Sequence, residues 1–387
     1  MWPKTKNQQK IIDVSKRIAT QIKSTASAFD TKGTFPHSHF DLIRDTGYLT
    51  AAVPTAYGGW GSSLLELMLG QYELGKVDGS TAVSVGMHHQ TVGTEASESK
   101  WPVSARSQIF NDIVNEGALI NNVASEPELG SPRGGGTFAT VLSPGDNGDW
   151  ILNGRKNWST LSPQLTYALT YASLENGTNQ IVKIAQKMNA HGVSIDETWN
   201  SMAMRSTGSH DIVFDNVRVC DEDILIKIDP SLPSASLNEG DAWFPLLLSA
   251  ANLGIARAAS SYAIDFAINR KPTGSQSSIS QIPFVRQQIA EMESILMMAY
   301  RTLFSCGEDW DNYPDHRADL LIEIGIVKIK TIDASIAVTD KAMRIVGGVA
   351  LEKNRPLERY FRDVRSAVSN PPIEARALNQ LAVLLLD

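Results

Sequence analysis

The chain has 387 residues, which is more than one hydrophobic core usually supports, so two or three packed units are expected. With 42% hydrophobic and 20% charged residues, its composition is that of an ordinary globular protein. Acidic residues outnumber basic ones by 42 to 35 and no dense Lys/Arg run occurs, which argues against nucleic acid and membrane surfaces as partners.

Cysteine usage indicates the redox compartment. Only two cysteines occur, Cys220 and Cys306, and neither belongs to a CxxC pair or has a histidine pattern beside it. We therefore expect no disulfide framework, no metal site and a reducing compartment. No apolar run approaches the roughly 18 residues that a transmembrane helix needs, and the first ten residues are too polar for a signal peptide. These features favour a cytoplasmic enzyme or binding protein.

The first two thirds of the chain change from a helical to a strand pattern. Up to about residue 121, apolar residues recur at three and four positions, as in IIDVSKRIATQIKS and LLELMLGQYELGKV. Between about residues 123 and 225, short runs rich in β-branched and aromatic residues, such as DWILNGRKNWST and DIVFDNVRV, alternate with turn clusters. This pattern predicts a small antiparallel sheet or barrel.

The helical period returns in the last third of the chain. It runs through LLLSAANLGIARAASSYAIDFAIN, FVRQQIAEMESILMMAYRTLFSC, ADLLIEIGIVKIKTIDASIAVTDKAMRIV and EARALNQLAVLLL. Segments of this length and amphipathicity predict a helical bundle. We therefore predict an α+β multidomain fold with an N-terminal all-α domain over residues 1–121, a middle antiparallel β-barrel domain over residues 122–228 and a C-terminal four-helix bundle over residues 229–387.

Several motifs occur in register with this order of domains. They are ASEPELGSP, DWILNGRKNWST, MRSTGSHDIVFDNVRV, RIVGG and LERYFRD. Their order and spacing resemble the acyl-CoA dehydrogenase superfamily across nearly the whole chain. The resemblance implies a flavoprotein, with FAD as the family's usual cofactor and FMN as the alternative.

The resemblance implies flavin contacts in the middle domain. Ser125 would hydrogen-bond the pyrimidine side of the isoalloxazine ring, and Ser131 would bind the pyrophosphate. Trp158 would pack on the ring, while Thr160 would approach its N5 atom. An apolar wall and hydroxyl donors are what such a ring requires. The alternative is that Trp158 is a sheet core residue and that the three hydroxyls are turn or strand groups.

The resemblance also implies cofactor contacts in the last domain. Arg270 matches an arginine that reaches the cofactor pyrophosphate of a neighbouring subunit, although a solvated helix end would look the same. Gly347 and Gly348 would let the backbone approach the adenosine half. Arg344 stands where the family commonly has a glutamine, which alters the adenine side, or it simply caps a helix C-terminus.

The stretch AVSNPPIEA, residues 367–375, lacks a residue on which the family's chemistry depends. In acyl-CoA dehydrogenases a glutamate after the Arg-Asp motif removes the α-proton of the thioester while hydride leaves to flavin N5. Counting nine positions from Arg362 places that site at Pro371, which has no titratable group. Some relatives carry the glutamate on a bundle helix, directly before an arginine that contacts CoA. Those two positions align with Phe244 and Pro245, so the alternative base and the CoA arginine are missing too.

Three other side chains are candidates for catalysis. Glu374 falls in the first turn of the last predicted helix, where the helix dipole favours a carboxylate without any catalytic role. Asn370 suits the N-cap of that helix, and it could also donate a hydrogen bond at a flavin site. His88 and His89 lie on a helix that in this fold runs near the substrate cavity, and we take His89 as a candidate proton donor or acceptor. Their alternative is one packed and one solvated histidine.

Three functions remain open. The first is a flavin-dependent dehydrogenase that oxidises a CH–CH bond of an acyl thioester or related substrate and passes electrons to an electron-transfer flavoprotein. The second is a monooxygenase or oxidase of the same fold that uses reduced flavin and O2, supplied by a separate flavin reductase. The third, a non-catalytic flavin-binding relative, is disfavoured by the retained flavin motifs. The resemblance also implies a homodimer or homotetramer, and the apolar helix ending AVLLLD fits burial at such a contact.

Overall fold

The computed structural model describes residues 3–128, 138–175, 180–229 and 238–386. The N-terminal part is helical, as the sequence predicts. Its helices are α1 (Lys6–Ile22), α2 (Ala26–Lys32), α3 (His37–Asp45), α4 (Leu64–Gly75), α5 (Gly79–Glu98) and α6 (Val103–Glu116), with the short 3-10 helix η1 (Tyr48–Thr50) between α3 and α4. Helix α4 begins at a capping box in which the Ser63 hydroxyl accepts from Glu66 N and the Glu66 carboxylate accepts from Ser63 N.

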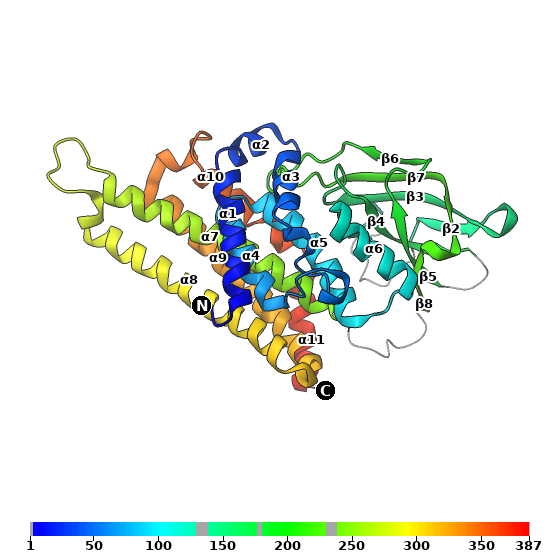
Figure 1. The fold of residues 1–387 in the computed structure, drawn as a ribbon. Helices are drawn as coiled ribbons and strands as arrows, with labels where there is room; N and C mark the ends of the chain where they lie inside the picture. The colour runs from blue at the N-terminus through cyan, green and yellow to red at the C-terminus, as the bar shows by residue number, and fades with distance from the viewer. Residues whose placement is uncertain (1–2, 129–137, 176–179, 230–237, 387) are drawn as a thin grey trace.

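Within the described ranges, eight strands form one sheet at the right of Figure 1. The strands are β1 (Ile120–Val123), β2 (Val141–Pro144), β3 (Trp150–Ser159), β4 (Tyr167–Leu174), β5 (Ile181–Lys187), β6 (Val193–Asp196), β7 (His210–Val219) and β8 (Ile224–Ile228). Their order is β6-β7-β3-β2-β4-β5-β8, and β1 pairs with β4. The domain limits after residues 121 and 228 stay predictions.

The predicted antiparallel pairing holds for most of the sheet, with two exceptions at β4. β1 and β2 both run parallel to β4, whereas the other five described pairings are antiparallel. Alternating apolar residues fix which face of a strand is buried but not which strand lies beside it. The pairing of β1 follows from its entry out of α6 into the middle of the sheet, which no local pattern records.

The C-terminal part is built on three helices of 30 residues each, α7 (Gly240–Asn269), α8 (Pro283–Asn312) and α9 (Arg317–Val346). The shorter α10 (Leu357–Asp363) follows, and α11 (Glu374–Leu386) packs against α9. All four helical segments predicted for the bundle are therefore confirmed. Helix α4 packs against both α7 and α8, which joins the bundle to the N-terminal helices.

Helix α7 is the centre of the molecule. It is the one described helix that is long and apolar enough to cross a membrane by length and composition, contrary to the sequence expectation, and 83% of that window is buried inside the protein. A helix that is apolar all round is expected where neighbours surround it. Because α4, α5, α8 and α9 all contact α7, its apolarity reflects a core position.

The Arg-Asp motif at the end of α10 joins the three parts of the chain. Arg362 donates to the Asp30 carboxylate of α2 at 2.7 Å and to Met202 O, in the segment before β7, at 2.7 Å. The neighbouring Asp363 carboxylate accepts from Met204 N at 2.8 Å. Burial raises the pKa of Asp363 to about 7. This junction lies directly before the stretch that lacks the family's glutamate.

Candidate active site

Trp158 is the most conspicuous residue of the sheet. It lies in the penultimate position of β3 with a left-handed φ of 51°, and its side chain is 65% exposed. Bulky residues seldom adopt such a φ, and tryptophan is seldom left so exposed. The alternative that Trp158 is a core residue of the sheet is therefore excluded. A bare indole at a strand end offers the apolar wall that a flat aromatic cofactor needs.

A row of hydroxyls connects Thr160 to the end of the segment before β7. The Thr160 and Ser209 hydroxyls lie 2.8 Å apart, and the Ser209 and Thr207 hydroxyls lie 2.7 Å apart. Thr207 in turn donates to Met204 O at 3.0 Å, while Asn121 donates to Thr160 O at 3.0 Å. Sequence reasoning missed Thr207 and Ser209, although the cluster STGS before a strand marked them as a polar turn.

Polar groups without partners surround the same strand end. Ser125 O accepts from Asn157 N at 3.0 Å, which places the exit of β1 beside the end of β3. Among the described residues, the buried oxygens Asn157 Oδ1, Ser159 Oγ and Ser206 Oγ have no hydrogen-bond partner. Unsatisfied buried polar atoms call for a ligand or water. The predicted phosphate contact Ser131 lies outside the described residues. The groups present fit the ring edge of a flavin.

Val83 of α5 marks where this edge meets the bundle. One apolar cluster contains Met204, Ile255 and Val364, and a second contains Leu248, Ile332 and Ala367; Val83 packs against both. Phe244 of α7 packs against the second cluster. Three parts of the site are thus gathered around one stretch of α5. They are the hydroxyl row, which ends at Met204, then Phe244, and then the loop after Ala367. These apolar contacts also keep water out.

Neither family position for the base carries an ionisable group. Pro371 follows the 3-10 helix η9 (Ser366–Val368), and Phe244 and Pro245 lie in the first turns of α7. Glu374 is exposed at the first residue of α11, and Asn370 is half-buried. The buried carboxyl nearest in sequence, Asp363, is already bonded to Met204 N.

The two histidines of α5 are both fully buried in the core. Ile120 N donates to His88 Nδ1 at 3.2 Å, so the Nε2–H of His88 donates to Leu49 O at 2.9 Å. Burial lowers the pKa of His88 to about 4, and this neutral ring joins α5 to β1 and η1.

His89, predicted as a proton donor or acceptor, is a packed side chain in this structure. Its ring meets the Tyr48 ring edge-on with centroids 4.8 Å apart, and neither ring nitrogen has a partner among the described residues. Burial lowers its pKa well below the usual value. Because six residues turn a helix by about 240°, His89 points away from the face of Val83.

The remaining predicted cofactor residues lie elsewhere. They are Arg270, Arg344, Gly347 and Gly348, all exposed, at the C-terminal ends of α7 and α9. Leu248 of α7 lies in one cluster with Ile332 of α9, and Ile336, one turn further along α9, packs against the cluster of Ile255, so the two helices run in the same direction. Figure 1 shows this end of the bundle on the left, away from the sheet. Within one chain the predicted cofactor residues therefore form two separate groups.

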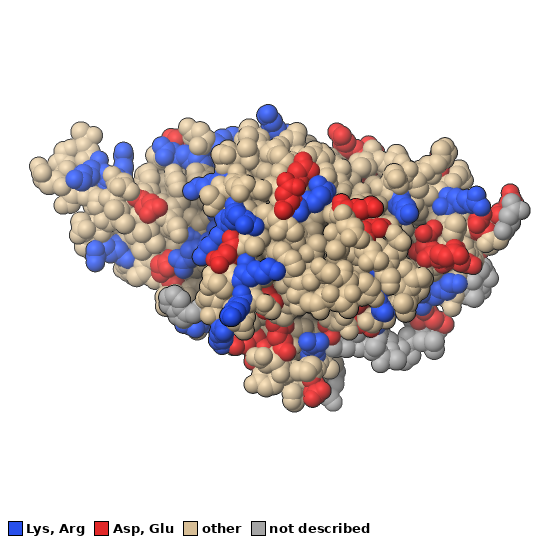
Figure 2. All heavy atoms as spheres, viewed as in Figure 1, with Lys and Arg blue, Asp and Glu red and all other residues tan. Residues whose placement is uncertain are grey.

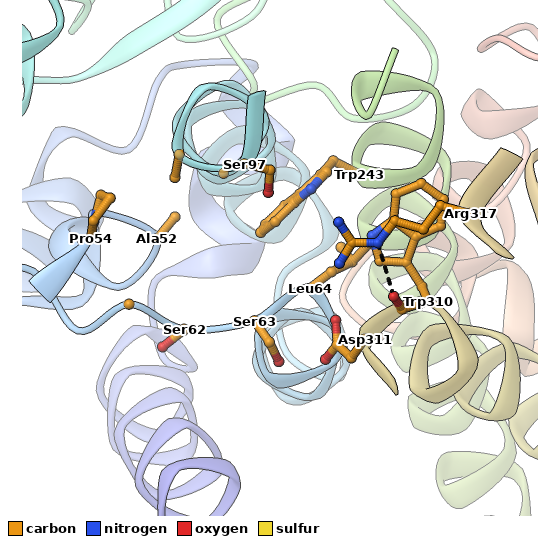
Figure 3. Close-up of a pocket in the computed structure, with 13 residues that line it drawn as sticks. Ala52, Pro54, Ser62, Ser63, Leu64, Ser97, Trp243, Trp310, Asp311 and Arg317 are labelled. Carbon is orange, nitrogen blue, oxygen red and sulfur yellow. Dashed lines mark hydrogen bonds between the residues drawn. The ribbon is translucent and has the colours of Figure 1, made fainter. Parts of the chain in front are cut away.

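A hollow of about 310 Å³ lies between the N-terminal helices and the bundle, and Figure 3 shows its lining. Arg317 on its wall donates to Glu239 at 2.6 Å and to Trp310 O at 3.1 Å. Asp311 accepts from Leu65 N at 3.2 Å, and burial raises the pKa of Asp311 to about 6. None of the predicted cofactor or catalytic residues lines this hollow, and its charged groups hold helix ends together.

Comparison with known proteins places the chain in a family. Models of the N-terminal, middle and C-terminal domains of acyl-CoA dehydrogenases match residues 5–101, 122–217 and 246–369. The protein named "Putative acyl-CoA dehydrogenase YdbM", from Bacillus subtilis strain 168, is 37% identical over 366 residues, which span 95% of this chain and 94% of that protein. This chain belongs to the acyl-CoA dehydrogenase superfamily and is a flavin-dependent oxidoreductase.

Two solved structures show that the fold does not separate the candidate reactions. FMN-bound TdsC of Paenibacillus sp. A11-2, a dibenzothiophene monooxygenase, matches with a TM-score of 0.86 at 21% identity over 97% of both chains. Butyryl-CoA dehydrogenase of Megasphaera elsdenii also matches with a TM-score of 0.86, at 19% identity over 100% of both chains. The reaction must therefore be argued from side chains.

Proposed function

We propose that this chain is a flavin-dependent monooxygenase that uses reduced flavin and O2. The observation that carries the proposal is that Pro371 and Phe244 occupy the two family positions for the base, and Pro245 that of the CoA arginine, while Trp158 and the Thr160 hydroxyl row remain in place. Reduced flavin supplies two electrons and two protons: one oxygen atom of O2 enters the substrate, the other leaves as water, and the flavin is released oxidised. No removal of a carbon-bound proton by the protein is required.

The alternative, oxidation of an acyl thioester, needs a base within hydrogen-bond reach of the α-proton. Glu374 is the carboxylate nearest to Pro371 in sequence, three positions on. It is exposed at the start of α11, whereas Ala367 is buried and Val83 and Phe244 are partly buried against its cluster. A carboxylate in water is a poor match for a reaction in an apolar pocket, so we do not assign Glu374 as the base.

The chain's own groups suit the proposed reaction. Trp158 gives the ring an apolar wall, and the Thr160 hydroxyl, held by Ser209, offers a fixed hydrogen bond at its edge. The Asn370 side chain has no hydrogen bond to a described residue, so its amide is available to a bound molecule. FMN fits the proposal better than FAD, because Arg344 stands where the family commonly has a glutamine on the adenine side, and because TdsC binds FMN.

The proposal includes a homo-oligomer, as a dimer or tetramer. Helix α11 buries only Ala377 within the chain, and four successive residues at its end, from Val383 to Leu386, are 49% to 82% exposed. Phe284, Met297 and Met298 of α8 are 62% to 68% exposed. Apolar surfaces of this kind are typical of protein interfaces. Acidic and basic side chains are interspersed over the face shown in Figure 2.

The proposal also names the partner and the compartment. A separate flavin reductase would supply the reduced flavin, in place of the electron-transfer flavoprotein that a dehydrogenase needs. Cys220 and Cys306 are unpaired, the first exposed and the second buried, which supports a reducing, cytoplasmic setting.

The test compares how the protein and free flavin handle O2. Purified protein loaded with FMN is reduced anaerobically and mixed with O2 while released H2O2 is followed. We expect H2O2 to appear at least tenfold more slowly than from free reduced FMN, because the pocket excludes water. H2O2 release as fast as that from free reduced FMN would remove the basis for the proposal.

A further inference from the structure

A buried lysine of α9 faces the loop that replaces the family's glutamate. The side chain of Lys328 lies halfway along α9 and is 1% exposed. Its ammonium donates to the backbone oxygens of Ala367 at 2.9 Å, Asn370 at 2.7 Å and Pro372 at 3.2 Å. An ammonium group has three N–H donors, and each of them is used here. Such charge-assisted bonds are about twice as strong as neutral ones.

The loop has few other ways to hold its shape. Pro371 and Pro372 have no backbone N–H and cannot donate. The nearest described backbone bonds are Asn370 N to Ala367 O at 3.3 Å on one side, and Arg376 N to Ile373 O at 3.1 Å on the other. The carbonyls of Asn370 and Pro372 lie in the segment between these two bonds, and both accept from Lys328.

The helix beneath the loop is shaped to admit it. Gly325 precedes Lys328 by three residues, so both lie on one face of α9. A Cβ atom at Gly325 would lie 3.3 Å from Ala377 Cβ and 3.6 Å from Pro372 Cγ. The glycine therefore lets the loop and the start of α11 approach within reach of the ammonium.

We propose that Lys328 is a positioning residue of the flavin site, which holds the Asn370–Pro372 turn beside the cluster that contains Ala367 and against which Phe244 and Val83 pack. The inference rests on the proposed function in one respect, because it assigns the turn the task of presenting the Asn370 amide. The ammonium acts through the turn and does not itself touch the cofactor.

The charge of Lys328 matters as well as its length. Burial lowers the pKa of Lys328 to about 8, and the charge of Asp333, one turn on, opposes this shift. A neutral amine has two N–H groups and a lone pair, so one of the three carbonyls would lose its donor. Two other sets of charged groups lie nearby. Arg365, directly before η9, pairs with Asp340 of α9 at an N–O distance of 2.6 Å, and Glu374 and Arg376 lie at the start of α11.

The first experiment measures amide hydrogen exchange of residues 366–377 in the full chain without flavin. Lys328→Met should speed this exchange about tenfold at pH 7, while thermal melting shows that the variant is folded. Lys330→Met is the matched control, because Lys330 lies two residues away, is exposed and pairs with Asp333, and it should exchange like the wild type.

The pH profile separates a charged clamp from simple packing. After correction for intrinsic rates, the wild type should show faster exchange above about pH 8, whereas Lys328→Arg, which keeps its charge, should show no such step. Wild-type exchange in folded Lys328→Met, or the same step in Lys328→Arg, would overturn the inference.

A second readout keeps the inference distinct from the proposed function. With FMN bound, reduced Lys328→Met should release H2O2 at least fivefold faster than the wild type after mixing with O2. If the wild type already releases H2O2 as fast as free flavin, the proposed function fails, and the exchange experiment still decides the role of Lys328. If the wild type retards release and Lys328→Met retards it equally, the positioning role fails alone.

Discussion

Replacing Trp158 by alanine should weaken flavin binding without unfolding the protein. The side chain is 65% exposed, so of the roughly 250 Å² of a tryptophan about 160 Å² is open to a ligand. One flat face is about half of that, and the flavin ring loses a similar area. At about 25 cal/mol per Å² the contact contributes roughly 4 kcal/mol. Alanine keeps part of this contact, so we expect a loss of about 2 kcal/mol, or roughly 30-fold in Kd.

The assay is quenching of free FMN fluorescence on binding, with FAD in parallel. Melting of the flavin-free variant should change by no more than about 0.5 kcal/mol in stability, because the side chain packs against little. Trp150→Ala is the control, since Trp150 begins the same strand and its indole bonds to Asp221 at 2.8 Å. A change in Kd below about threefold for Trp158→Ala, with a folded protein, would refute the assignment of this indole to the flavin.

Three further predictions concern the scaffold of the site. His88 has a pKa of about 4 in the fold against 6.5 when free, so the unfolded chain binds the extra proton; the stability it contributes is complete above pH 6.5 and is lost as pH falls towards 4, by about 2 kcal/mol at pH 5. Urea unfolding at pH 7 and pH 5 should show a loss that is about 2 kcal/mol smaller in His88→Gln than in the wild type, because the buried His89 contributes to the loss in both. Gly93→Ala should cost about 1–3 kcal/mol in the same assay, because a Cβ there would lie 2.2 Å from the Trp243 ring. Lys156→Met should lower stability by about 3–5 kcal/mol, because it leaves the buried Glu126, which lies 2.7 Å from the Lys156 ammonium, without its counter-charge. Lys330→Met is the control: it breaks an exposed ion pair with Asp333 and should leave stability unchanged within about 0.5 kcal/mol.

The secondary structure could be predicted from the sequence because it depends on local apolar periodicity. The helices and strands follow apolar periods of 3.6 and 2 residues, so their identity could be predicted from the sequence, and the family resemblance singled out Trp158 and Thr160 as flavin contacts. Pairing was not readable, because the parallel contacts of β1 and β2 with β4 join distant segments. The surroundings of His89 could not be predicted either, because the sequence of a helix does not show whether a histidine faces a cavity or an aromatic ring such as that of Tyr48.

Other features of the site could be recognised only in the three-dimensional structure. Lys328 reads as one of several lysines on a helix, and only the fold shows its ammonium beneath the carbonyls of a loop some forty residues later. The two groups of cofactor residues also look equivalent in the sequence. Their separation to opposite ends of one chain becomes visible only when α7 and α9 are seen to run parallel.

The most direct test of the central claim is anaerobic mixing of the flavin-loaded protein with a panel of acyl-CoA thioesters while the oxidised flavin band is recorded. Because Pro371, Phe244 and Pro245 carry no base, the account predicts that no thioester bleaches the band, although dithionite does. Bleaching by any thioester at a rate that saturates with its concentration would contradict the account and show a dehydrogenase whose base lies outside both family positions.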